Sequence, residues 1–263
     1  MNPGTVYLVG AGPGDPELIT LKARRVLAEA DAVVYDHLVD AALLELAPPG
    51  CERIFAGKKG GQVCRPQDEI DGMLVRLALE GKSVVRLKGG DPFIFGRGGE
   101  EASALAAAGI PFEIVPGVTA ALAAAAYAGI PLTHRLHSSA VVFLTGHEDP
   151  AKADATVHWE DYARLKATLC VYMGVRKLPV IARRLEAGGM APSTPAAIVE
   201  SATTEAHRRI LGTLGTIANL AAREDVQAPA LLIIGEVAAF AESLSWFENG
   251  YSRISMGRGG RQL

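Results

Sequence analysis

The stretch Val-Tyr-Leu-Val-Gly-Ala-Gly-Pro-Gly-Asp-Pro, residues 6–16, predicts a buried β-strand that ends in a glycine-rich turn. Short apolar runs of this kind alternate with longer helical patterns along the chain, which is typical of α/β proteins with buried, largely parallel strands. Open α/β sheets bind ligands at the carboxyl ends of their strands, where glycine lets the backbone approach closely. The stretch therefore predicts the fold class and the sheet edge at which a ligand binds.

Two series of strands predict two α/β layers. The first series has strands near 6–9, 32–35, 52–55, 83–87 and 112–115, with helices near 18–30, 67–80 and 100–108. The second has strands near 140–144, 168–173, 196–199, 208–211 and 230–234, with helices near 175–187 and 216–223. A helix over 118–129 joins the layers, and segment 208–211 is compatible with an antiparallel partner. We expect an N-terminal α/β domain over 1–115, a linker helix and C-terminal α/β domain over 116–245, and a flexible tail over 246–263.

The composition excludes several classes of partner. The chain has 263 residues and a formal net charge of -3, so there is no global electrostatic reason to bind nucleic acid or an anionic membrane. It contains no uncharged apolar run long enough to span a bilayer, and its first residues do not resemble a signal peptide. Three cysteines without metal-type spacing suit a reducing compartment. We expect a cytoplasmic protein without a metal, a nucleic-acid partner or a membrane partner.

The glycine turn after the first strand differs from a dinucleotide-binding fingerprint. That fingerprint requires glycine at its sixth position, where this chain has Asp15. Pro13 and Pro16 also remove backbone donors that a phosphate would need. Asp36, after the second strand, resembles the ribose-binding carboxylate of such proteins, but this one match does not compensate for the missing glycine in the loop. The turn therefore disfavours a dehydrogenase.

A second glycine-rich loop, Lys-Gly-Gly-Asp-Pro-Phe-Ile-Phe-Gly-Arg-Gly-Gly-Glu-Glu at 88–101, follows the strand near 83–87. The pair Gly89-Gly90 presents backbone groups without side-chain obstruction. Phe93 and Phe95 stand where an ordinary loop would be polar, and an apolar wall beside bare backbone suits a flat organic ligand. The loop lacks a Gly-Lys-Ser/Thr triplet, which disfavours a nucleoside-triphosphate site.

These two loops resemble the signatures of the uroporphyrinogen-III C-methyltransferases, members of the tetrapyrrole methylase superfamily. The first signature is shared across the superfamily, whereas the second is more specific. Further matching motifs occur in the expected order: Pro-Gly-Val-Thr-Ala-Ala at 116–121, Pro-Leu-Thr-His-Arg at 131–135 and Tyr-Met-Gly at 172–174. The resemblance covers roughly residues 5–240.

The resemblance implies two α/β domains with a ligand cleft between them, a homodimer, and S-adenosylmethionine as co-substrate. By position, the residues that it implies for cofactor contact are Pro13, Gly89, Gly90, Asp91, Thr119, Ala120, Met173 and Ala202. Structural alternatives exist for several of them. Pro13 also suits a turn, Thr119 and Ala120 suit the start of a helix, and Met173 suits a buried strand end.

The implied reaction transfers two methyl groups to C2 and C7 of uroporphyrinogen III, which gives precorrin-1 and then precorrin-2 for sirohaem, cobalamin or haem d1 synthesis. A pyrrole carbon is an electron-rich nucleophile and the sulfonium methyl is already activated, so positioning and exclusion of water are the main requirements. Proton loss from the ring leaves a role for a general base. The alternatives are a methyltransferase of a later precorrin, a same-fold methylase of protein or RNA, and a non-catalytic nucleotide-binding module.

Substrate recognition requires cations, because uroporphyrinogen carries many carboxylates. The resemblance implies that Arg97, Glu100 and Arg135 line the substrate region, with the arginines binding carboxylates and one of Arg97 or Glu100 assisting proton removal. Arg97 and Glu100 are three residues apart, so a plain surface ion pair is the alternative.

Three further features of the sequence bear on the site and the product. His134 and His137 are interpreted as solvated or capping residues. A basic loop with Lys58, Lys59 and Arg65 is either an attractant for the anionic substrate or simply solvated. The length leaves no room for the dehydrogenase and ferrochelatase domain of some relatives, so we expect precorrin-2 to be handed on.

Overall fold

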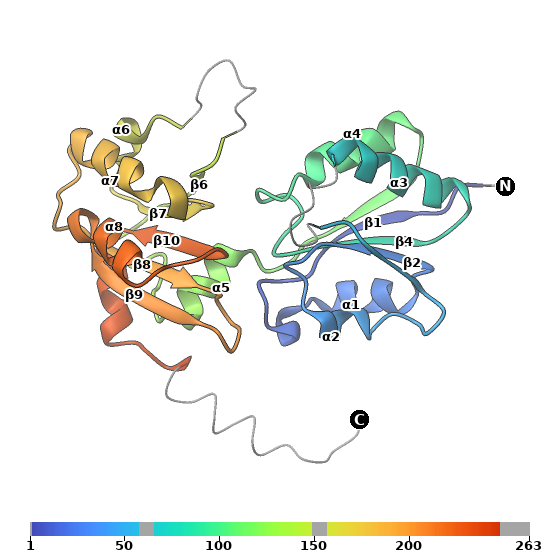
Figure 1. Ribbon diagram of the computed structural model, residues 1–263, viewed down its shortest axis with the longest axis horizontal. Coiled ribbons are helices and arrows are strands. Elements are labelled where there is room, and N and C mark those ends of the chain that lie inside the picture. Colours follow the sequence, from blue (N-terminus) through green and yellow to red (C-terminus); the bar gives the residue numbers. More distant parts are fainter. Residues whose placement is uncertain (1, 58–65, 149–156, 248–263) are drawn as a thin grey trace, which may run out of the picture. The chain divides into compact units, whose positions relative to one another are not determined.

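The computed structural model describes residues 2–57, 66–148 and 157–247, and the chain divides into two compact units, Met1–Ala120 and Ala121–Leu263 (Figure 1). Each unit contains a five-stranded sheet with helices on both faces, which confirms the predicted α/β class. The chain passes from one unit to the other in the first turn of α5 (Ala120–Tyr127). The basic loop residues Lys58, Lys59 and Arg65, and the predicted tail from residue 248 onward, lie outside the described residues.

The sheet of the first unit is parallel throughout, as predicted. Its strands are, in spatial order, β3 (Glu52–Phe55), β2 (Ala32–Tyr35), β4 (Val84–Lys88), β1 (Val6–Gly10) and β5 (Phe112–Val115). Strand β4 is central, and its side chains are buried along its whole length. The carboxyl ends of β1, β4 and β5 therefore meet at one edge of the sheet, where the two glycine-rich loops begin.

Helices cover both faces of this sheet, which explains why its strands read as continuous apolar runs. One core lies between the sheet and the helices α3 (Gln67–Leu79) and α4 (Gly98–Ala107). The other lies between the sheet and the helices α1 (Leu21–Ala28) and α2 (Ala41–Leu44), and a short 3-10 turn, η1 (Pro16–Leu18), precedes α1. Thr20 caps α1 by accepting a hydrogen bond from the backbone N–H of Ala23 at 3.1 Å.

The sheet of the second unit is mixed, so the expectation of largely parallel strands is wrong there. Its strands are, in spatial order, β6 (Val141–Thr145), β7 (Thr168–Tyr172), β10 (Ala230–Ile234), β8 (Pro195–Glu200) and β9 (Arg208–Thr213). Only β6 and β7 are parallel, and the other three pairs are antiparallel. Burial on both faces makes a strand apolar whatever its direction. The short connection over 201–207 indicates an antiparallel pair, because it is long enough for a hairpin but too short for a crossover.

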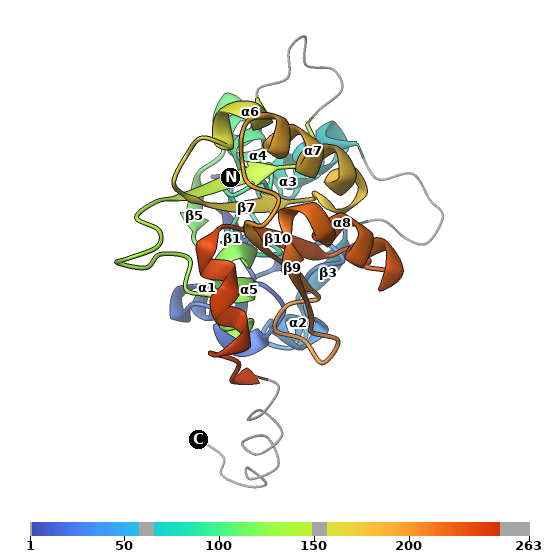
Figure 2. The same ribbon diagram turned by 90° about the vertical axis from the view of Figure 1, so that its left-hand side faces the viewer.

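The second sheet is also covered on both faces, as Figures 1 and 2 show. On one face lie α6 (Trp159–Tyr162), α7 (Leu178–Ala187), which follows the 3-10 turn η2 (Val175–Lys177), and α8 (Leu214–Arg223). On the other face lie α5 and the 3-10 helix η3 (Glu236–Glu242). No helix among the described residues is long and apolar enough to cross a membrane.

Candidate functional site

Four glycines bring three loops into backbone contact at the carboxyl edge of the first sheet. A Cβ atom on Gly117 would lie 2.3 Å from the carbonyl oxygen of Gly90, and one on Gly10 would lie 2.6 Å from the Cα of Gly117. Gly12 and Gly90 also exchange backbone hydrogen bonds, at 2.6 and 3.2 Å. A side chain at Gly10 or Gly117 would push the loops apart. These two glycines therefore serve close packing of the loops.

Asp91 is a connector within this group of loops. Its Oδ1 accepts a hydrogen bond from the backbone N–H of Phe93 at 2.8 Å, and its Oδ2 accepts one from Gly117 at 3.0 Å. The backbone of Thr119 and Ala120 lies next to Gly90, within 3.8 Å of where a Cβ would stand. The predicted cofactor contacts of the second loop therefore lie beside Thr119 and Ala120. Pro13, another predicted contact, directly follows Gly12, which pairs with Gly90.

The second loop presents two aromatic side chains to solvent. Phe93 is 54% exposed and Phe95 is 42% exposed, so the aromatic surface inferred from the sequence is accessible. Phe95 and Arg97 both have left-handed backbone conformations, with φ of 52° and 59°, which non-glycine residues adopt at a cost. Such strained backbone conformations cluster at ligand-binding loops.

Arg97 and Glu100 face one another, as their spacing predicts. The guanidinium donates two hydrogen bonds to the carboxylate, Nε to Oε1 at 2.9 Å and Nη2 to Oε2 at 2.5 Å. Both side chains are about half exposed, so the ion pair itself contributes little to stability. A bidentate pair does restrict the orientation of the arginine. Its role toward a ligand stays a prediction.

A buried group of charges, missed by the sequence analysis, lies beneath this loop. Arg86 and Lys88 of β4 and Glu101 of α4 are almost wholly buried. Arg86 Nε and Lys88 Nζ donate to the same Glu101 oxygen at 3.0 and 2.8 Å, and Arg86 also lies 3.5 Å from Asp36. Burial, together with the charge of Arg86, lowers the pKa of Lys88. The sequence signal was present: two cations at alternate positions of an otherwise apolar strand.

In the second unit, the predicted contacts Met173 and Ala202 lie at one edge of the sheet. Strands β7 and β8 both run antiparallel to β10, and Tyr172 and Val199 both pair with Leu231. Met173 is 51% exposed with a φ of 54°, so the alternative of a core methionine is wrong. The backbone is left-handed again just after β8, at Ser201 and Thr203, on either side of Ala202.

Tyr172 ties this edge to the start of α5. Its hydroxyl oxygen accepts a hydrogen bond from the backbone N–H of Ala121 at 3.0 Å. Backbone N–H groups in the first turn of a helix have no partner within the helix, so the hydroxyl acts as a cap. Thr119 and Ala120, two predicted cofactor contacts, immediately precede the capped residue, and Met173 immediately follows Tyr172. The motif Tyr-Met-Gly at 172–174 did not predict this capping role of Tyr172.

Arg135 projects from an exposed turn of the second unit. The turn is closed by His134 and Ser138, which exchange backbone hydrogen bonds at 2.8 and 2.9 Å. His134 accepts the backbone N–H of Leu136 through Nδ1 at 3.2 Å and stacks on Phe240 with ring centroids 4.9 Å apart. His134 thus has the capping role expected of it, and the turn it closes displays Arg135 to solvent.

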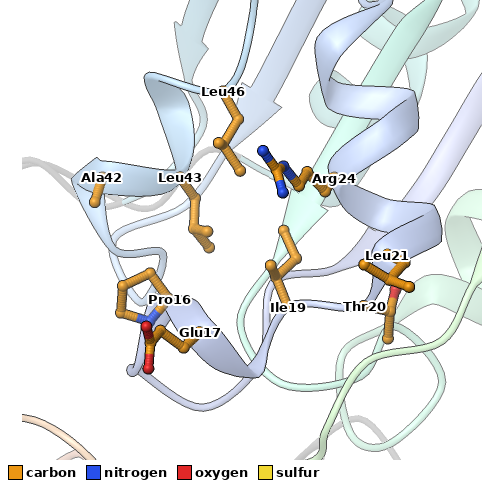
Figure 3. A pocket seen from close by; sticks show the side chains of 9 residues that line it. All are labelled: Pro16, Glu17, Ile19, Thr20, Leu21, Arg24, Ala42, Leu43 and Leu46. Atoms are coloured by element: carbon orange, nitrogen blue, oxygen red, sulfur yellow. The ribbon is translucent and has the colours of Figure 1, made fainter. Parts of the chain in front are cut away.

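Figure 3 shows a separate hollow of about 390 Å³ in the first unit, between η1, the start of α1 and α2. It is lined by Pro16, Glu17, Ile19, Thr20, Leu21, Arg24, Ala42, Leu43 and Leu46. None of the residues predicted to bind cofactor or substrate belongs to this lining. The hollow is mainly apolar and open, and its two charged side chains have opposite signs. The hollow is therefore distinct from the candidate site at the loop edge.

Comparison with curated proteins shows relatives that are about twice as long. The siroheme synthase of Stutzerimonas stutzeri is 53% identical over 245 residues, which is 93% of this chain and 52% of the relative. The siroheme synthase of Azotobacter vinelandii is 53% identical over 249 residues, which is 95% of this chain and 53% of the relative. The chain thus spans about half the length of the curated relatives it matches.

Comparison with solved structures gives matches over nearly whole chains. The native uroporphyrin III C-methyl transferase of Thermus thermophilus is 44% identical with a TM-score of 0.77, over 90% of this chain and 99% of that one. The Thermus enzyme complexed with S-adenyl homocysteine is 43% identical, with a TM-score of 0.75 over 89% of this chain and 93% of that one. A cobalt precorrin-4 methyltransferase is 30% identical, with a TM-score of 0.79 over 89% of this chain and 95% of that one. The sequence also matches the family model for Tetrapyrrole (Corrin/Porphyrin) Methylases over residues 5–218. With both glycine-rich signatures inside that range, the chain belongs to the tetrapyrrole methylases and is a methyltransferase of that family.

Proposed function

We propose that this chain transfers methyl groups from S-adenosylmethionine to C2 and C7 of uroporphyrinogen III, forming precorrin-1 and then precorrin-2. The observation that carries the proposal is the 44% identity to 99% of the Thermus uroporphyrin III C-methyl transferase. The second loop agrees with it, because the exposed Phe93 and Phe95 offer apolar contact to a flat macrocycle beside a displayed arginine.

A later precorrin is the second candidate substrate. The cobalt precorrin-4 methyltransferase superposes with a TM-score of 0.79, against 0.77 for the native Thermus enzyme. The backbone therefore does not separate the two substrates, since one fold serves both relatives. Sequence identity does separate them, at 30% against 44%, and it favours uroporphyrinogen III.

The loops fit S-adenosylmethionine chemically. The cofactor has no phosphate, so a turn in which Pro13 and Pro16 lack N–H groups is no obstacle. Gly90 offers bare backbone beside Thr119 and Ala120, and Met173 offers an exposed apolar side chain. We propose that these elements hold the cofactor, together with Pro13, Gly89, Asp91 and Ala202. When bound, S-adenosylmethionine supplies an activated methyl group.

Substrate binding is assigned to the displayed arginines. Arg97 and Arg135 bind carboxylates of the macrocycle, and Glu100 orients Arg97 through the bidentate pair. Ring methylation requires that a proton leave the macrocycle. Of the two residues considered for that step, Glu100 is the chemically suitable one, because a guanidinium does not deprotonate in proteins.

The direct test is anaerobic incubation of the purified chain with S-adenosylmethionine and enzymatically made uroporphyrinogen III. We expect the product to gain the mass of two methyl groups and to show the absorbance of precorrin-2 after oxidation. Unchanged uroporphyrinogen in the presence of demonstrably bound cofactor would contradict the proposal. Methylation of a precorrin-3 or precorrin-4 preparation under the same conditions would then support the second candidate.

We further infer, from the resemblance to the uroporphyrinogen-III C-methyltransferases, that the chain works as a homodimer in the cytoplasm. Light scattering on a sizing column should give the mass of two chains. A fully active single chain would contradict the homodimer without affecting the proposed reaction.

A further inference from the structure

Three charged side chains are packed together inside the first unit. Arg86 and Lys88 of β4 are each 4% exposed, and Glu101 of α4 is 0% exposed. One oxygen, Oε1 of Glu101, accepts hydrogen bonds from Arg86 Nε at 3.0 Å, Lys88 Nζ at 2.8 Å and Gln67 Nε2 at 3.3 Å. The other oxygen, Oε2, is buried and has no hydrogen-bond partner among the described residues. The carboxylate is thus held tightly at one oxygen only.

This arrangement is a poor way to stabilise a protein. The surrounding core of β4, α3 and α4 is aliphatic, with Val84, Leu74 and Leu105 among its members. Desolvation of buried charges commonly cancels their attraction, and apolar replacements of similar volume are often neutral or stabilising. An unpartnered buried oxygen adds to the cost. The cluster therefore requires an explanation other than the stability of the fold.

The position of the cluster in the chain offers that explanation. Lys88 is the last residue of β4 and the first of the second glycine-rich loop, and Glu101 is the last residue of that loop and lies in the first turn of α4. The Lys88–Glu101 ion pair spans 13 positions and joins the two ends of that loop. Between these ends lie the predicted site residues Gly89, Gly90, Asp91, Arg97 and Glu100.

We propose that Glu101 is a positioning residue for the ligand-binding loop over residues 89–100. Its buried carboxylate fixes the start of α4 against the end of β4, and so sets the span that the loop bridges. Asp91 and the contact of the Gly98 N–H with the Pro92 carbonyl, 3.0 Å long, then determine the path between those ends. Glu101 is fully buried, so it acts through the loop and not on the ligand. The inference rests on the proposed function, because the loop is taken as the cofactor and substrate site.

The first variant is Glu101→Gln, which keeps the size of the side chain and removes its charge. Two buried cations then face a neutral amide, so we expect the melting temperature to fall by about 5–15 °C. We also expect S-adenosylmethionine to bind at least roughly tenfold more weakly at a temperature where circular dichroism shows a folded protein. A matched control is Glu160→Gln, which breaks the bidentate pair with Arg184 in the second unit and should leave cofactor binding unchanged.

The decisive variant is the triple replacement Arg86→Met, Lys88→Met and Glu101→Met. An apolar cluster should restore most of the melting temperature, because the three buried charges are gone and Asp36, which loses Arg86 as its partner, is about a quarter exposed. If Glu101 positions the loop, cofactor affinity stays at least roughly tenfold weaker although stability has returned. Parent-like affinity in the triple variant, or in Glu101→Gln, would overturn the inference.

Hydrogen exchange supplies a readout that does not depend on the triple variant folding. In Glu101→Gln, amides of residues 89–100 should exchange faster, while those of β7 and β10 in the second unit should be unchanged. Equal exchange in the loop would overturn the inference. These outcomes are separable from the proposed reaction. A parent protein that binds S-adenosylmethionine without methylating uroporphyrinogen contradicts the reaction alone, and one that fails to bind it leaves loop exchange as the test of Glu101.

Discussion

Asp91 and Gly117 are joined by a hydrogen bond of 3.0 Å, from the backbone N–H of Gly117 to Oδ2 of the carboxylate. Because the other carboxylate oxygen already accepts the N–H of Phe93, Asp91 holds two loops in place before any ligand arrives. Loss of activity after replacement of Asp91 would therefore not by itself demonstrate direct contact with the cofactor. Stability and binding have to be measured together.

Replacement Asp91→Ala should lower the free energy of unfolding by about 2–4 kcal/mol, because two charge-assisted hydrogen bonds are lost. Cofactor affinity should fall with it. Chemical denaturation and titration calorimetry would measure the two effects. The control is Asp40→Ala, which removes the cap of α2 in the same unit and should cost about 1 kcal/mol without altering affinity. Unchanged stability in Asp91→Ala would instead assign the carboxylate to the ligand alone.

Replacement Tyr172→Phe tests whether the cap on Ala121 matters for the cofactor. The hydroxyl is removed and the ring retained, so unfolding should become easier by only about 0.5–1.5 kcal/mol. We expect KM for S-adenosylmethionine to rise several-fold with little change in kcat. Tyr162→Phe, in α6 of the same unit, serves as the control and should leave KM unchanged. An unaltered KM in Tyr172→Phe would show that the start of α5 needs no cap for binding.

Replacement Gly117→Ala should be severe. The added Cβ meets the carbonyl oxygen of Gly90 at 2.3 Å, and the free energy of unfolding should fall by about 2–3 kcal/mol or more as the loops separate. Gly72 makes a matched contrast, because a Cβ there has nothing within 4 Å and the residue lies inside α3. Gly72→Ala should stabilise the protein by about 0.5–1 kcal/mol. Thermal unfolding of the two variants checks both signs, and a mild effect at Gly117 would disagree with the close contact.

Replacement Arg97→Ala tests carboxylate recognition separately from cofactor binding. Losing a bidentate arginine contact should raise KM for uroporphyrinogen III by roughly 10- to 100-fold, while S-adenosylmethionine affinity stays the same. Arg135→Ala should behave alike. Arg223→Ala, whose side chain is 72% exposed and pairs with the adjacent Glu224, is the control. Equal loss of affinity for both ligands would indicate a collapsed loop and not a lost contact.

The buried thiol of Cys170 should be unreactive. Burial raises the pKa of Cys170 to about 12 and also raises the pKa of Cys51. Only the thiolate is a nucleophile, so at pH 8 iodoacetamide should modify Cys170 at least about 100-fold more slowly than a free cysteine. Mass spectrometry of timed samples measures the rate, with denatured protein as the control. Rapid labelling of Cys170 in folded protein would contradict its burial in β7.

The strands of the first unit, and the edge at which both glycine-rich loops begin, could be predicted because apolar runs end abruptly at glycine. Ala32–Tyr35 and Phe112–Val115 are found where the pattern places them. Strand direction in the second unit could not be predicted, because burial on both faces erases the alternation that marks an antiparallel sheet. The elements α2, α6 and η3 were missed, since α2 and α6 are four-residue helices, too short to show a helical period, and the pattern likewise did not reveal η3.

Members of the candidate site could be proposed from sequence where a residue type is unusual for its place, as with glycines at a strand end and phenylalanines in a loop. They could not be proposed where a contact depends on a partner far along the chain. The hydrogen bond between the Ala121 N–H and the Tyr172 hydroxyl spans 51 positions, and the sequence around neither residue predicts it. Glu101 is of the same kind, since its charge is ordinary in sequence and unusual only when packed against Arg86 and Lys88, whose alternation in an apolar strand is itself a signal.

Each unit is one continuous stretch of chain, and the chain passes from the first unit to the second only once, at Ala120–Ala121. A recombination that exchanged the second half of one methylase for that of a relative would thus need only one junction. A junction between residues 117 and 121 would take each of two close contacts from a single parent. A break before residue 116 would keep Ala121 and Tyr172 from the same parent, but it would pair Gly117 with a foreign Gly90. A break after residue 121 would do the reverse. Chimaeras joined outside this range should be tolerated best when glycine stands at 90 and 117 in both parents and tyrosine at 172.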